Sequence, residues 1–262
     1  MHITLDGRRI YYDLAGPDQA PVVCFTHSAA SDSGMWAEQL PALLAAGYRV
    51  LRLDMRGHGG SDPVPGDYTM EQLAQDVAAA LEFLAITRVH LCGLSIGGML
   101  GQAFAIRHGQ KLLSAMLCDT TAQTPPEAAE AIEAVTKARS LAPLADAIME
   151  RWFTDAYKPR NPGRWKQIHA TIAATTPAGF LGCAAASLNV DFVPQLPAVR
   201  VPTLVVCGAD DQGTPPAGNK RIAELIPGGR YQEIPGARHF MNVEHPDTFN
   251  RIMVGWLEAR RG

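Results

Sequence analysis

The sequence predicts an α/β protein in which helices cover both faces of a mostly parallel sheet. Unbroken apolar runs, such as residues 22–26, 89–92 and 203–207, are typical of strands that are buried on both faces. Helical patterns separate these runs along the chain, and this alternation is typical of a parallel sheet. With 262 residues, of which 47% are hydrophobic, the chain is long and apolar enough to bury one sizeable core.

The expected strands and helices alternate along most of the chain. A hairpin comes first, because strand-like residues 3–5 and 9–14 flank an Asp6-Gly7 turn. Thr69 and Gln72 have the spacing of a capping box, which marks the beginning of a helix. Further strands are expected over residues 22–26, 48–53, 89–92, 113–118, 203–207 and 231–234. Helices are expected over residues 35–46, 69–84, 99–108 and 216–225.

The alternation stops between residues 121 and 196, where alanine, helix formers and several prolines replace strand-like runs. We expect a core domain of residues 1–120 and 197–262, with residues 121–196 inserted in it as a helical cap, or lid. Open α/β sheets bind ligands at the carboxyl ends of their strands, so we expect the cap to cover that edge. Its four short helices are expected over residues 126–138, 141–152, 162–175 and 177–188.

Composition and charge argue against several classes of partner. A formal net charge of −3 provides no basic face for nucleic acid or an anionic membrane. The first residues lack an apolar signal region, and no run approaches the length of a membrane span, so we expect a cytoplasmic protein. The expected partner is a small-molecule substrate, and the sequence does not indicate an oligomeric state.

The cysteines and the absence of known cofactor motifs point to a protein that needs no metal or cofactor. Five cysteines include no Cys-x-x-Cys pair, and Cys24, Cys92, Cys118 and Cys207 fall in apolar strand-like runs. There we expect them to act as small buried hydrophobic residues. No Gly-rich phosphate loop or metal-spaced His/Cys cluster occurs, so we expect no cofactor.

Ser95 is the candidate nucleophile. It stands in Gly93-Leu94-Ser95-Ile96-Gly97, between the strand-like run 89–92 and a helical stretch. A Gly-x-Ser-x-Gly between a strand and a helix is the nucleophile elbow, a turn so sharp that the flanking positions exclude a Cβ. The serine hydroxyl then lies exposed above the sheet, beside the amino end of a helix.

A serine nucleophile needs a general base and an acid that orients the base. Enzymes with this elbow place them in the chain order Ser, Asp, His. His239 follows the last expected strand through a turn-forming loop, whereas His245 precedes Pro246 at the start of a helix. The acid should follow the strand 203–207, where Asp210 and Asp211 both qualify.

The tetrahedral intermediate of acyl transfer also needs donors for its oxyanion. The N–H of Ile96, directly after the nucleophile, is one candidate. The second is expected in the loop that follows strand 22–26, at Ala29 or else at Ser28. We expect His27 to be a structural hydrogen-bonding residue there. Arg56 and His58, in the Gly-rich loop 54–61, are also expected to be structural.

The chain resembles the α/β-hydrolases over its full length, and in its details it is most similar to the 3-oxoadipate enol-lactonases of aromatic catabolism. The residues that carry the resemblance are His27-Ser28, Met35-Trp36, 51–59 with Ser61, Gly93 to Gly98, Trp152-Phe153, and His239 with 242–244 and Pro246. The resemblance implies a serine hydrolase of a small ester or lactone, with a triad of Ser95, Asp211 and His239. It favours Asp211 over Asp210 because the resembling pattern Gly-x-x-Asp-x-x-x-Pro runs from Gly208 to Pro215.

The cap supplies the candidate substrate-binding residues. A carboxylate-bearing lactone would need a cation directed inward. Arg151, beside Trp152, and Arg164, beside Trp165, are the arginines selected for that role, and the two tryptophans offer aromatic walls. Most other cap cations are expected to be solvated.

Three other functions remain open on the sequence alone. A general carboxylesterase and a carbon–carbon bond hydrolase of ring-cleavage products use the same triad. A non-catalytic small-molecule receptor can share the fold, although an intact triad argues against it. Dehalogenases and epoxide hydrolases of this fold carry an aspartate at the elbow, so Ser95 argues against both.

Overall fold

The computed structural model describes residues 1–124, 139–188 and 190–261, and its strands form one eight-stranded sheet in the order β1-β2-β4-β3-β5-β6-β7-β8. The two pairs β1·β2 and β2·β4 are antiparallel, and the other neighbours are parallel. The predicted, mostly parallel sheet is therefore confirmed. The strands are β1 (His2–Leu5), β2 (Arg8–Ala15), β3 (Val22–Thr26), β4 (Arg49–Leu53), β5 (Val89–Leu94), β6 (Leu112–Cys118), β7 (Thr203–Gly208) and β8 (Arg230–Ile234).

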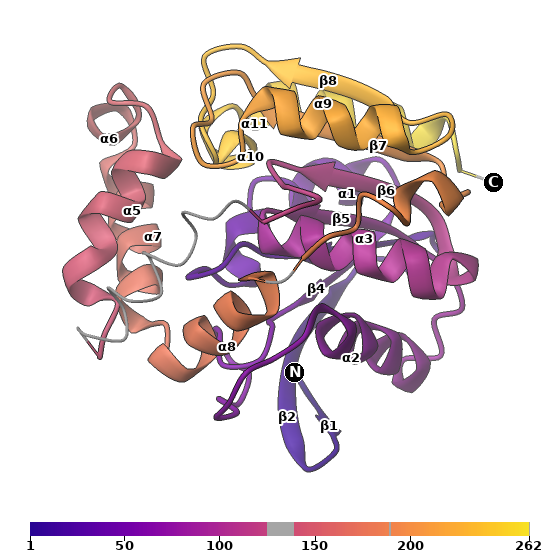
Figure 1. Ribbon diagram of the computed structural model, residues 1–262, viewed down its shortest axis with the longest axis horizontal. Coiled ribbons are helices and arrows are strands. Elements are labelled where there is room, and N and C mark those ends of the chain that lie inside the picture. The colour runs from indigo at the N-terminus through magenta and orange to yellow at the C-terminus, as the bar shows by residue number, and fades with distance from the viewer. Residues whose placement is uncertain (125–138, 189, 262) are drawn as a thin grey trace.

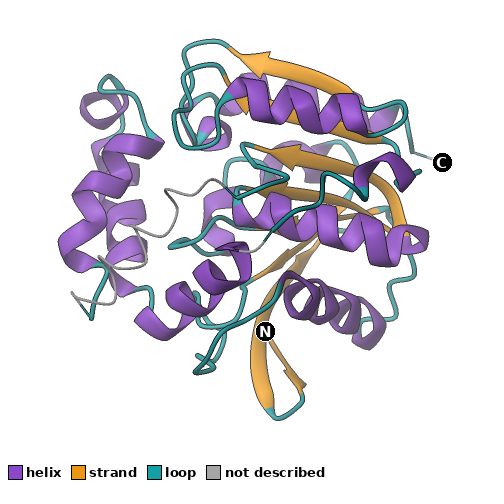
Figure 2. Cartoon of the chain, in the orientation of Figure 1, coloured by secondary structure: helices purple, strands orange, loops and turns teal. Residues whose placement is uncertain are grey.

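Helices cover both faces of this sheet (Figure 2). One face packs against α2 (Met70–Phe83), α3 (Ile96–His108) and α9 (Pro216–Leu225). The other packs against α1 (Leu40–Ala45) and α11 (Pro246–Glu258), with α10 (Met241–Glu244) beside α11. This two-sided burial explains why the inner strands lack the alternation of a half-exposed strand.

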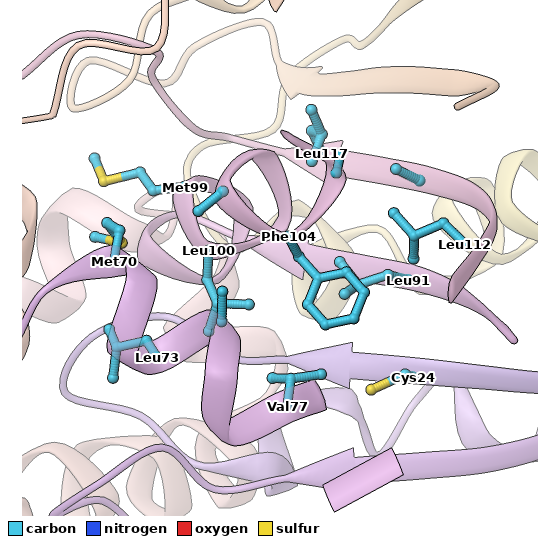
Figure 3. Close-up of a cluster of buried hydrophobic side chains, with 14 of the residues drawn as sticks. Cys24, Met70, Leu73, Val77, Leu91, Met99, Leu100, Phe104, Leu112 and Leu117 are labelled. Atoms are coloured by element: carbon cyan, nitrogen blue, oxygen red, sulfur yellow. The ribbon is translucent and has the colours of Figure 1, made fainter. Parts of the chain in front are cut away.

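Successive strand residues supply the two cores alternately. In β3, Cys24 joins the cluster beneath α2 and α3, whereas Val23 and Phe25 join the cluster on the opposite face. Figure 3 shows Phe104 of α3 among Leu91, Cys24 and Val77 of the first cluster. The five cysteines are free and buried, as predicted for the four that were assigned to strands.

The expected helices of the core are confirmed at α2, α3 and α9, whereas one of them is divided by a proline. Thr69 and Gln72 form the predicted capping box, with both reciprocal hydrogen bonds, at the start of α2. The single helix expected over residues 35–46 is wrong: a 3₁₀ turn ends at Trp36, and α1 begins anew at Leu40. Pro41 lacks an N–H and fits only the first turn of a helix, so the helix begins beside it.

Among the described residues, four α-helices lie between β6 and β7 in the sequence and gather at the side of the molecule toward which the β8 arrow points (Figure 1). They are α5 (Ala145–Trp152), α6 (Tyr157–Arg160), α7 (Pro162–Ala174) and α8 (Pro177–Leu188), and we call them the cap helices. The helix expected over residues 126–138 falls outside the described residues. Pro143 replaces the start of the expected helix 141–152 with a 3₁₀ turn, and α6 was not predicted.

None of the described helices is by itself both long and apolar enough to cross a membrane; α7 and α8 meet the length and composition criteria only as a pair bent by 86°.

Lowering the pH is expected to destabilise the fold through its buried neutral histidines. Burial lowers the pKa of His58 to about 3 and that of His90 to about 4. Between these values and the unfolded value of about 6.5, the unfolded chain binds protons that the folded chain excludes. The contribution of these two histidines to stability is therefore complete above about pH 6.5, and below it that contribution falls by up to about 1.4 kcal/mol per pH unit per group.

Denaturant unfolding at about pH 7 and about pH 5 measures this loss. His58→Asn keeps a donor for the Arg56 carbonyl but cannot titrate. Its free energy of unfolding should therefore fall less between the two pH values than that of the wild type. His2→Asn, at an exposed position, is the matched control and should behave as the wild type. An equal loss in wild type and His58→Asn would contradict the assignment to His58.

Candidate active site

Ser95 stands on a strained turn between β5 and α3. Its φ of 61° and ψ of −121° lie outside the regions that non-glycine residues ordinarily adopt. A Cβ added at Gly93 would lie 2.1 Å from the Gly97 carbonyl oxygen, and one at Gly97 would lie 2.4 Å from that of Thr26. The predicted sharp turn is thus confirmed, with its two glycines required by the close approach of backbone.

His239 and Asp211 meet at the ends of β8 and β7. The Asp211 Oδ2 lies 2.7 Å from His239 Nδ1, and Asp211 is buried whereas Asp210 is exposed. Asp211 also accepts hydrogen bonds from the N–H of Gly213 and from the hydroxyl of Thr214, at 2.8 and 2.6 Å. Between the two candidate acids, only Asp211 contacts the imidazole among the described hydrogen bonds.

The environment of Asp211 keeps its carboxylate ionised. Burial by itself would raise its pKa, but the facing His239 and the Thr214 hydrogen bonds outweigh burial and hold the pKa well below its usual value. Because the carboxylate accepts from Nδ1, that nitrogen carries the proton, and Nε2 is left as the acceptor. The pair can therefore remove a proton from a hydroxyl that reaches Nε2.

Four adjacent parallel strands, β5, β6, β7 and β8, bring Ser95 and this pair to one edge of the sheet. Ser95 N–H donates to the Cys118 carbonyl at the end of β6. Asp119, the next residue, donates its N–H to Val206 of β7. In the described structure, the Ser95 hydroxyl itself makes no hydrogen bond to His239. Such bonds commonly tighten only when substrate is bound, so this does not argue against Ser95 as the nucleophile.

The oxyanion candidates lie beside the elbow. β3 pairs with β5 so that Thr26 is opposite Gly93, which brings the loop after Thr26 next to Ser95. Ser28 N–H is occupied because it donates to the Met35 sulfur at 3.3 Å. Within the described residues the N–H groups of Ala29 and Ile96 have no acceptor, so both are available to a ligand. The geometry favours Ala29 over Ser28.

The histidines and the arginine of the neighbouring loops are structural, as predicted. His27 Nε2 accepts from Met55 N–H at 2.8 Å, so its Nδ1 donates to the Ser28 carbonyl. Arg56 forms a buried ion pair with Asp76. The hydrogen bonds of His27 and Arg56 hold the loops, and His58 Nδ1 bonds to the Arg56 carbonyl, whereas His58 Nε2 is buried without a partner among the described residues.

The cap candidates differ in their surroundings. Trp152 is buried, stacks on Phe240 at 3.9 Å between ring centroids, and lies 6.4 Å from the His239 ring. Trp165 packs against Phe153 at 5.8 Å, inside the apolar cluster that joins the cap to the core. Of the two tryptophans, Trp152 is the one that contacts the neighbourhood of the base.

Arg164 is engaged elsewhere. Its guanidinium forms a two-pronged ion pair with Glu38, at 2.7 and 2.9 Å, and donates to the Gly34 carbonyl at 2.8 Å. These contacts join α7 to the loop that follows β3, so the geometry favours tethering of the cap over the expected substrate contact. Arg151 is exposed, and its guanidinium lies 3.4 Å from the place of a Cβ at Gly213, beside the Asp211 loop.

Two polar residues to which the sequence analysis assigned no role lie close to His239 in the chain and bind the cap. Arg238 donates to the carbonyls of Glu150 and Phe153, each at 2.7 Å, where α5 ends. Glu244 accepts from the N–H and the hydroxyl of Thr154. A third missed residue, Asp119, is buried beside the pair, and its position directly after β6 was a signal that would have identified it.

Comparisons with known proteins agree with this geometry. Residues 21–246 match the family described as the alpha/beta hydrolase fold. The chain is 30% identical to 3-oxoadipate enol-lactonase 1 of Acinetobacter baylyi, over 97% of this chain and 94% of that protein. An enol-lactonase structure from Burkholderia xenovorans superposes with a TM-score of 0.94 at 35% identity, covering 98% of this chain and all of that one.

An esterase is nearly as similar in structure. The thermophilic esterase of Thermogutta terrifontis, determined with malate bound, superposes with a TM-score of 0.92 at 28% identity, and the match covers both chains in full. The elbow, the sheet and these matches over nearly the whole chain lead to one conclusion. The chain belongs to the α/β-hydrolase family and is a hydrolase.

Proposed function

We propose that the protein is a serine hydrolase that opens a small lactone or ester bearing a carboxylate, with 3-oxoadipate enol-lactone as the leading substrate. The observation that carries the proposal is the hydrogen bond between buried Asp211 and His239 at the sheet edge that also carries the Ser95 elbow. The similarity to enol-lactonases over almost the whole chain supports the choice of substrate.

In the proposed reaction, Ser95 Oγ attacks the carbonyl carbon of the lactone while His239 Nε2 takes its proton. The carbonyl oxygen becomes an oxyanion that accepts from the N–H groups of Ile96 and Ala29. The ring C–O bond then breaks, and the leaving oxygen receives the proton from His239. Asp211 stabilises the imidazolium that exists between these transfers.

The second half of the cycle regenerates the serine. Water gives a proton to His239 Nε2 and attacks the acyl carbon, through the same oxyanion site. The bond to Ser95 Oγ breaks, and the proton returns to that oxygen. One water is consumed and one carboxylic acid is formed, so the cycle needs no oxidant, metal or nucleotide.

A general carboxylesterase is the second candidate function. It is favoured by the similarity to the malate-bound esterase and by the Glu38 ion pair that removes Arg164 from substrate recognition. A panel of an enol-lactone, short p-nitrophenyl esters and a ring-cleavage dienoate distinguishes the candidates by relative kcat/KM. The highest value for the enol-lactone supports the proposal, and the highest value for a neutral ester supports the esterase.

Ser95→Ala is expected to abolish turnover and to leave the fold intact, because only Oγ forms the acyl-enzyme. Intact-mass measurement after a fluorophosphonate reagent should show one adduct on the wild type and none on this variant. Ser140→Ala, in the turn before α5, is the matched control and should still be labelled. Turnover by Ser95→Ala near the wild-type rate would rule the elbow out as the nucleophile.

Asp211→Asn and Asp210→Asn form a matched pair of neighbouring substitutions. Asp211→Asn should lower kcat by about a thousandfold or more, because the amide cannot hold the required tautomer of His239. Asp210→Asn should leave kcat within about threefold of the wild type, since its side chain is exposed. Steady-state kinetics on one substrate test this, and the reverse order would transfer the role to Asp210.

Arg151→Gln tests recognition of the substrate carboxylate. If Arg151 binds it, the loss of about 1.5–3 kcal/mol of charge-assisted hydrogen bonding should raise KM for an acidic substrate about tenfold or more. KM for a neutral ester should not change. Arg164→Gln, which breaks the Glu38 ion pair, should instead alter both substrates alike. No selective effect of Arg151→Gln would remove this residue from the proposal.

A further inference from the structure

Asp119 is a buried carboxyl that the proposed mechanism does not use. It follows β6 directly, has no exposed surface, and adopts a left-handed φ of 38°. One oxygen of Asp119, one oxygen of Asp211 and one ring nitrogen of His239 all lie within 4.8 Å of one another. Two carboxyls therefore share one side of the imidazole.

The two oxygens of Asp119 have different surroundings. Oδ1 accepts from the N–H of Gly208, at the end of β7, at 2.8 Å. Oδ2 is buried and has no hydrogen-bond partner within the described structure. An ionised oxygen without a partner is costly in such a site, whereas a protonated one is tolerated more readily.

We infer that Asp119 is a reserve carboxyl beside the triad: it is neutral and takes no part while Asp211 is ionised, and it becomes a positioning residue for His239 only when the charge of Asp211 is removed. This inference rests on the proposed function, because it assumes that His239 is the base. It goes further in assigning two acids to one base.

Electrostatics at the site agree with this division of charge. Burial, and after it the negative charge of Asp211, raise the pKa of Asp119 well above its usual value. Two carboxylates at this separation do not both ionise readily, so the ionised one is Asp211, which has the more numerous hydrogen bonds. Removing its charge removes one of the two main causes of the raised pKa of Asp119.

The other titratable groups around Asp119 do not provide a counter-charge. Cys118 precedes it, and Cys207 and Tyr231 face it from β7 and β8. Burial holds the pKa of each of these groups above its usual value, so all three are neutral near pH 7. Besides burial, the charge of Asp211 is therefore the main cause that keeps the pKa of Asp119 raised.

A purely structural role would depend on the Gly208 hydrogen bond alone. Asp119→Asn retains an oxygen that accepts this bond and removes only the ability to ionise, so it separates the two roles. Since Asp119 is neutral in the wild type, this variant should keep kcat within about threefold of the wild type and keep its pH profile.

The deciding measurement compares Asp211→Asn with the double variant Asp119→Asn/Asp211→Asn. The single variant should keep a residual kcat that rises with pH as Asp119 ionises, and the double variant should be lower by about tenfold or more and lack that rise. In a Ser95→Ala background, the low-field Nδ1–H proton resonance of His239 should persist at high pH with Asp211→Asn and disappear in the double variant. Denaturant unfolding establishes that each variant is folded.

Equal residual kcat in the single and double variants would overturn the inference. So would a fall in kcat of about a hundredfold or more in Asp119→Asn alone, because that is roughly the effect of losing a catalytic hydrogen bond. A different experimental result would show that the proposed function itself is wrong. If Asp211→Asn keeps the wild-type kcat, then Asp211 is not the primary acid and the triad itself is wrong.

Discussion

The close approach of the Ser95 turn to the end of β3 is the constraint on which the site depends. With the Gly97 Cα so near the Thr26 carbonyl, the elbow and the loop after β3 cannot move independently. The same contact brings the loop after β3, which contains Ala29, next to the turn that carries Ser95 and Ile96. Backbone packing therefore fixes the strain at Ser95 together with the position of the proposed oxyanion donors.

His239, the proposed base, is held from the opposite side by the cap. Arg238 and Glu244 bind the end of α5, and Phe240 donates its N–H to the Trp152 carbonyl at 3.0 Å between them. His239 lies within the segment that these three contacts hold. The end of α5 and the loop of the base consequently form one unit, so a movement of α5 away from the sheet would also move the imidazole.

Much of the fold and of the proposed triad is predictable because its signals are local in sequence. The glycines that flank Ser95 predict the turn, and the apolar runs predict the inner strands. The helix breaks at Pro41 and Pro143 are not evident from the sequence, because the apolar residues on either side of each proline keep a helical spacing. The Arg164–Glu38 ion pair joins residues 126 positions apart, and no local pattern distinguishes it from a solvated arginine.

Charge determines how an acidic substrate can lie in this site. The sheet edge holds the ionised Asp211 beneath His239, so a second negative charge would be repelled from that side. Glu38 already neutralises Arg164, whereas Arg151 extends beside the Asp211 loop. Under the proposed function, the carboxylate of the substrate therefore lies on the cap side, near Arg151 and Trp152, with the ester or lactone carbonyl toward Ser95. In that arrangement the sheet edge supplies the proposed chemistry, and the cap selects which esters or lactones are hydrolysed.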